Sequence, residues 1–75
     1  MIINVFSPMK QEKIKEVLEA NEKPKYVLVG ELYTPMMKYE VTNAEDVTDV
    51  ANYTKQLIQA QPWGRVLFIR VTVDA

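Results

Sequence analysis

The C-terminal part of the chain contains its longest unbroken run of β-branched and aromatic residues, which spans residues 64–74. Every second position of this run from Leu67 to Val73 is aliphatic, whereas the positions between them mix apolar and polar side chains. Side chains alternate between the two faces of a strand. The pattern therefore predicts a strand with one face buried, carrying Leu67, Ile69, Val71 and Val73, and the other face only partly covered.

The same two-residue alternation predicts three further strands, over residues 2–6, 25–34 and 36–42. We expect the turn between the second and third of these at Pro35, because a proline inside a paired strand loses a ladder hydrogen bond. A tight turn at Gly30 is the alternative, since glycine suits the first central position of such a turn.

Apolar residues spaced three and four positions apart predict a helix between the first two strands. We expect it to begin at Ser7, whose hydroxyl can cap a helix, with Pro8 in its first turn. It should end near Asn21, because Pro24 prevents its continuation. Its apolar stripe includes Ile14, Val17 and Leu18.

A second helix is predicted between the third and fourth strands. Asn43 is expected to cap it, with Glu45 and Asp46 in the first turn, where the helix dipole favours acidic groups. The helix should end near Gln61, before Pro62. Its apolar stripe comprises Val47, Val50, Ala51, Thr54, Leu57 and Ile58.

The predicted order of elements is strand, helix, strand, strand, helix, strand. This order resembles the ferredoxin-like βαββαβ arrangement, a four-stranded antiparallel sheet with two helices on one face. The fold class is therefore α+β, and residues 1–75 form one domain. The resemblance is one of topology alone, and this topology serves many unrelated functions.

Composition removes several kinds of chemistry. The chain has neither cysteine nor histidine, so it lacks thiolates and also the commonest metal ligand and general base at neutral pH. Ser7, the only serine, has no such residue to activate it. With no catalytic or cofactor motif, we expect a protein that is not an enzyme and that binds no cofactor or metal.

The charge and the distribution of apolar residues bear on partners and location. Nine basic and ten acidic side chains leave a net charge of −1, which gives no electrostatic reason to expect nucleic-acid binding. No apolar run approaches the ~20 residues of a membrane span, and the first residues lack the features of a signal peptide. The expected location is cytoplasmic.

The sheet face turned away from the helices is the candidate site. An antiparallel sheet with a free face should carry polar residues there, yet the predicted strands place many apolar ones on it. We expect this face to form the interface of a homodimer in a small protein-interaction or regulatory module, such as an accessory factor or a phage-encoded inhibitor. The expected interface residues are Ile2, Phe6, Val27, Val29, Tyr33, Met36, Val66, Phe68 and Arg70.

An alternative function belongs to a different class. Two packed sheets can leave a cleft between them, here lined by Phe6, Tyr33, Phe68 and Arg70. Such a cleft would suit a small acidic or aromatic molecule.

Overall fold

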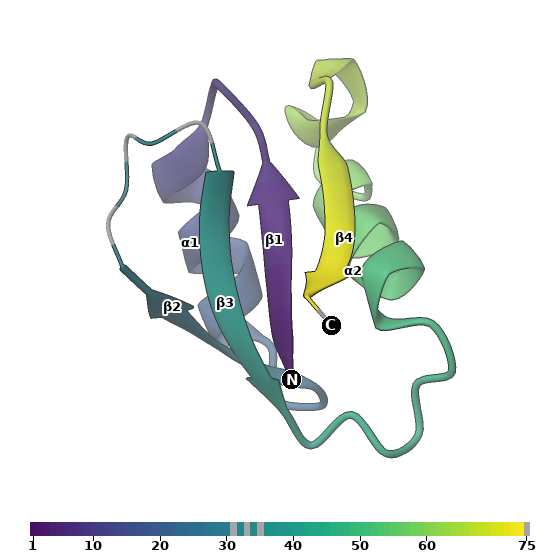
Figure 1. Ribbon diagram of the computed structural model, residues 1–75. Coiled ribbons are helices and arrows are strands. Elements are labelled where there is room, and N and C mark those ends of the chain that lie inside the picture. The colour runs from purple at the N-terminus through teal and green to yellow at the C-terminus, as the bar shows by residue number, and fades with distance from the viewer. Residues whose placement is uncertain (31, 33, 35, 75) are drawn as a thin grey trace.

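The computed structural model describes residues 1–30, 32, 34 and 36–74. Its elements follow the predicted order (Figure 1): β1 (Ile2–Phe6), α1 (Gln11–Ala20), β2 (Lys25–Val29), β3 (Met36–Thr42), α2 (Val50–Gln59), a 3-10 turn (Gly64–Val66) and β4 (Arg70–Asp74).

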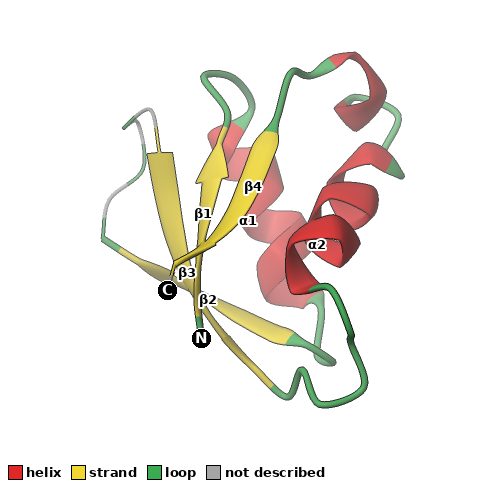
Figure 2. Cartoon of the chain, turned by 45° about the vertical axis from the view of Figure 1, so that its right-hand side comes forward, coloured by secondary structure: helices red, strands yellow, loops and turns green. Residues whose placement is uncertain are grey.

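The four strands form an antiparallel sheet in the order β2-β3-β1-β4. Both helices lie on the same side of it (Figure 2), with α1 against β2 and α2 against β4. This is the predicted α+β fold, and its strand order is that of the ferredoxin-like arrangement. The final strand forms one edge of the sheet and β2 the other.

Two strands match the prediction in bounds and in facing. β1 covers residues 2–6 and β3 covers residues 36–42, with Met37, Tyr39 and Val41 buried. The final strand is shorter than predicted, because residues 64–66 form a 3-10 turn and pairing with β1 begins only at Arg70. Of the four aliphatic residues predicted for the buried face of the longer strand, Ile69 is buried, Leu67 and Val71 are half-buried, and Val73 is exposed.

The hairpin between β2 and β3 is wider than a tight turn. β2 ends at Val29, and Gly30 follows with a positive φ of 100°, a conformation that glycine adopts without strain. Val29 pairs with Lys38, whereas a two-residue turn at Gly30 would pair it with Leu32. The alternative turn at Gly30 is therefore wrong, and the predicted turn at Pro35 lies outside the described residues.

The first helix begins later than predicted, and Ser7 does not cap it. Helix α1 starts at Gln11, and the buried Ser7 hydroxyl donates instead to the Met9 carbonyl at 2.7 Å. Gln11 is itself buried, and its side-chain amide donates to the Ser7 carbonyl oxygen at 2.8 Å and to the Thr34 carbonyl oxygen at 2.5 Å. These bonds tie the start of α1 to the loop after β1 and to the β2–β3 connection.

The second helix also begins later than predicted. Asn43 has a positive φ of 56°, and Glu45 and Asp46 lie in a turn that precedes the helix. Helix α2 starts at Val50, and its cap is Asp49, whose Oδ1 accepts the Asn52 backbone N–H at 3.0 Å. Asp and Asn have similar capping strength, so composition alone did not distinguish the two positions.

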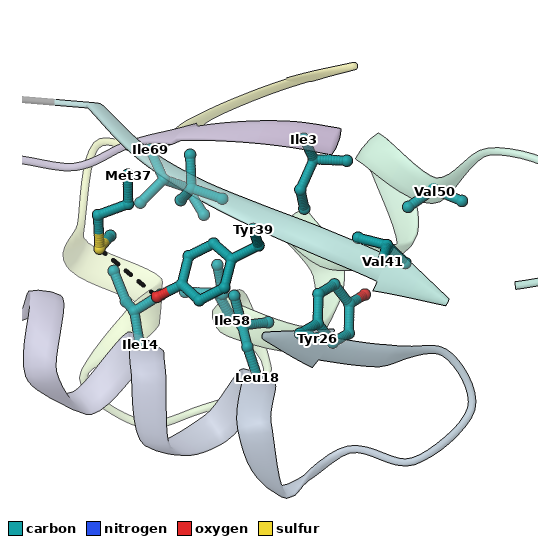
Figure 3. Packing of buried hydrophobic residues seen from close by; sticks show 11 residues of the cluster. Ile3, Ile14, Leu18, Tyr26, Met37, Tyr39, Val41, Val50, Ile58 and Ile69 are labelled. Atoms are coloured by element: carbon teal, nitrogen blue, oxygen red, sulfur yellow. Dashed lines mark hydrogen bonds between the residues drawn. The ribbon is translucent and has the colours of Figure 1, made fainter. Parts of the chain in front are cut away.

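The core lies between the sheet and the helices (Figure 3). Its buried apolar residues come from β1, β2, β3, both helices and the position just before β4: Ile3, Val5, Ile14, Leu18, Tyr26, Met37, Tyr39, Val41, Val50, Ile58 and Ile69. The Tyr39 ring reaches from β3 toward Ile14 of α1, and its hydroxyl donates to the Met37 sulfur at 3.6 Å. Burial, with a smaller contribution from the negative charge of Glu19, raises the pKa of Tyr39 well above its usual range.

A polar chain crosses the core from β2 to α2. The Thr54 hydroxyl donates to the Val50 carbonyl at 2.7 Å, and it lies 2.8 Å from the Tyr26 hydroxyl. A threonine hydroxyl has one hydrogen, so Tyr26 must be the donor to Thr54. Burial raises the pKa of Tyr26, and the bond to Thr54 opposes this in part. The two hydroxyls thus satisfy each other inside the core.

Replacing Ile69 with alanine should lower the free energy of unfolding by about 2–5 kcal/mol, because it removes a large side chain from the closed core. Val73→Ala, near the end of β4 and 45% exposed, should lower it by less than ~1 kcal/mol. Urea denaturation of both variants measures the difference. Equal losses would contradict the burial of Ile69 in the core.

Thr54→Val should leave the Tyr26 hydroxyl without an acceptor and lower the free energy of unfolding by about 1–3 kcal/mol. Tyr26→Phe should cost less, since Thr54 still donates to Val50. The double variant should be more stable than Thr54→Val alone, because no unpaired hydroxyl remains. A double-mutant cycle by urea denaturation tests this, and additive losses would contradict it.

Candidate functional site

The candidate site is the open face of the sheet, meaning the side of the four strands that the helices do not cover. Residues of β1 and β3 alternate strictly between the buried core and this face, so that Phe6 and Met36 belong to it while Val5 and Met37 are buried. On β2, Val27 and Val29 are exposed on either side of the half-buried Leu28. Strand periodicity alone therefore places these side chains.

Strand register brings residues that are distant in sequence into one row at the end of the open face. Phe6, the last residue of β1, pairs with Met36 on one side and with Arg70 on the other. β1 ends at this row, and β3 and β4 begin at it, so the row lies at the rim of the sheet. Phe68 lies two residues before the start of β4, beside the same rim.

These four side chains line a hollow of about 380 Å³: Phe6, Met36, Phe68 and Arg70. Phe6 is half-buried, Met36 is exposed, and Phe68 is 79% exposed. Two aromatic rings and a thioether thus form an apolar wall, and one guanidinium supplies a positive charge. Three of the four residues proposed from sequence to line a ligand cleft meet here, and the fourth, Tyr33, lies outside the described residues.

A polar row crosses the middle of the open face next to this hollow. Asn4 pairs with Lys38 on β3 and with Thr72 on β4. The Lys38 ammonium donates to Asn4 Oδ1 at 2.9 Å and lies 3.3 Å from Asp74 Oδ2. On the central strands this row separates Phe6 and Met36 from Ile2. The apolar surface expected from sequence is therefore divided, with Val27 and Val29 along the β2 edge.

Two of the expected interface residues do not lie in a strand. Val66 is in the 3-10 turn and is 86% exposed, and Phe68 lies between that turn and β4. Their placement on one face of a long final strand was therefore wrong. The cause is local. The Leu67 backbone N–H donates to the Gly64 carbonyl at 3.2 Å and forms the 3-10 turn, so the strand begins later than predicted.

Gly64 sets the path of the segment that carries Phe68. It is buried against the end of α2, where a Cβ atom would lie 2.0 Å from the Ile58 carbonyl oxygen. Only glycine permits so close an approach of two backbone segments. In the sequence, the glycine after Pro62-Trp63 is the signal for this tight backbone contact.

A second hollow, of about 610 Å³, lies at the opposite end of the sheet around the C-terminus of α1, where Asn43 follows the end of β3. Its lining mixes acidic and basic side chains: Glu19, Ala20, Asn21, Glu22, Lys23, Lys25 and Asn43. The Lys15 ammonium lowers the pKa of Glu19, whose other oxygen accepts the Leu28 backbone N–H at 3.3 Å. Charges of both signs give this hollow no clear preference for a ligand.

Replacing Gly64 with alanine should lower the free energy of unfolding by about 1–3 kcal/mol, because the methyl group overlaps a backbone atom that cannot move aside. It should also shift the emission of Trp63, the only tryptophan in the sequence. Urea denaturation followed by fluorescence measures both. Unchanged stability and emission would contradict the close approach to Ile58.

Other signals of function are few in the part of the chain that the structure describes. No helix there is long and apolar enough to cross a membrane, and no three acidic side chains there are grouped to hold a metal ion. No protein-family model matches the chain, and no curated protein and no solved structure matches it.

Proposed function

We propose that this chain is a cytoplasmic protein-interaction module that pairs with a second copy of itself through the open face, and that it acts as a regulatory or inhibitory factor rather than as an enzyme. The observation that carries the proposal is the exposure of large apolar side chains on and beside that face. Val27, Val29, Met36 and Phe68 are all exposed, and the helices cover the other side of the sheet.

Burial of these side chains would stabilise a dimer. Removing apolar surface from water contributes roughly 25 cal/mol per Å², and an exposed phenylalanine at the rim of an apolar hollow is a favourable anchor for a second molecule. Two such sheets packed face to face would form a sandwich with helices on both outer sides. A two-fold axis would let each copy present the same surface to the other.

The edges of the sheet favour pairing through the face over pairing through the backbone. β4 is an edge strand of only five residues, and it carries the charged side chains Arg70 and Asp74. Short, charged edges oppose strand addition. At the other edge, the Leu28 backbone N–H of β2 donates to the Glu19 carboxylate, so this donor is not available to an added strand.

Phe68→Asp tests the proposal directly, because a side chain that is 79% exposed contributes little to the fold of a single chain. We expect the wild type to be a dimer at micromolar concentration. The variant should dissociate at least tenfold more readily, equivalent to about 1.4 kcal/mol, because a carboxylate would enter an apolar interface. Light scattering measures the mass, and circular dichroism checks that the fold is retained.

Val66→Asp is the matched control, since Val66 is equally exposed but does not line the hollow. It should leave the dimer intact. A monomeric wild type contradicts the proposed self-association. A Phe68→Asp variant that stays dimeric contradicts an interface at this end of the face, and Val29→Asp then tests the β2 edge.

A further inference from the structure

The hollow at the rim of the open face has the features of a binding site for a small molecule in a single copy of the chain. Its volume of about 380 Å³ is at the lower end of the ~300–1,000 Å³ typical of ligand pockets. Its walls come from three strands or strand ends that the sheet holds in fixed register, so the site is formed before any ligand binds. A ligand would contact apolar groups on most sides.

Arg70 gives the hollow its chemical preference. Among the described residues, the Arg70 side chain makes no ion pair and no hydrogen bond, and no carboxylate of theirs lines the hollow. Asp74, on the same strand, is paired with Lys38. A guanidinium presents two parallel N–H donors that match the two oxygens of a carboxylate. Arg70 is therefore free to bind an anion next to an apolar wall.

We propose that this hollow binds a small organic monocarboxylate with an aromatic body. The carboxylate would pair with Arg70, and the ring would lie against Phe6, Met36 and Phe68, where aromatic and thioether contacts are favourable. A phosphorylated ligand fits less well, because the described lining supplies a single cation, Arg70. A neutral apolar ligand would leave the guanidinium unpaired.

Phenylacetate is a suitable probe, with phenylacetamide and acetate as matched controls. The amide keeps the ring without the charge, and acetate keeps the charge without the ring. Titrations of the full chain, labelled with ¹⁵N, are followed by two-dimensional NMR. We expect saturable shifts of the Phe6, Phe68 and Arg70 backbone amides, with a dissociation constant on the order of a millimolar because the hollow is open to water on one side. Both controls should bind at least about tenfold more weakly.

Arg70→Gln should weaken phenylacetate binding by about tenfold or more, and Arg70→Lys by less, since lysine keeps the charge without the planar fork. Arg65→Gln is the matched control, because Arg65 is an exposed arginine of the neighbouring 3-10 turn that does not line the hollow. It should bind like the wild type. Equal losses in Arg70→Gln and Arg65→Gln, equal affinity for the amide, or no saturable shift would each overturn the proposal. Phe68 anchors the proposed dimer and also lines the hollow, so the ligand and a second copy would compete for it, and phenylacetate should lower the mass of any dimer found by light scattering.

Discussion

In the described part of the chain, two helices of ten residues each cover one face of a four-stranded sheet. The closed core that results takes buried residues from the first three strands, both helices and Ile69 just before β4. Polar groups enter it only where they are satisfied, as when Tyr26 donates to Thr54 and Thr54 to Val50. Apolar side chains on the other face are exposed, because the helices pack against one side of the sheet only.

The open face is organised by charge as well as by apolar groups. Lys38 contacts Asn4 and Asp74 and so joins three strands through one ammonium group. Such exposed ion pairs contribute little to stability, typically ~0–1 kcal/mol. Here they place the Lys38 charge at the centre of the face, so that Arg70 is a separate cation at the rim. Self-association and anion binding would therefore compete for Phe68 at the rim, whereas Arg70 supplies the charge for the anion alone.

The candidate site depends on two structural details that lie outside simple periodicity. Register places Met36, Phe6 and Arg70 in one row, although they are far apart in the sequence. The close approach of Gly64 to Ile58 then brings Phe68 to the end of that row. The structure brings Phe6, Phe68 and Arg70 to one hollow, whereas sequence reasoning placed Val66 and Phe68 within the final strand. A 3-10 turn is stabilised by bonds between near neighbours, and its sequence is compatible with a strand.

The sequence by itself determined the order of the elements, the α+β class, the bounds of β1 and β3, and which residues of these strands are buried. The physical reason is that strand alternation and helical spacing are local properties, repeated over enough residues to be recognised. Only the tertiary structure decided where the helices begin and which residues meet at the rim. Ser7 and Asn43 are residue types that cap helices, yet α1 follows Lys10 and α2 is capped by Asp49. At the start of α1 a long-range bond holds the chain, because the Gln11 side chain donates to the Thr34 carbonyl oxygen.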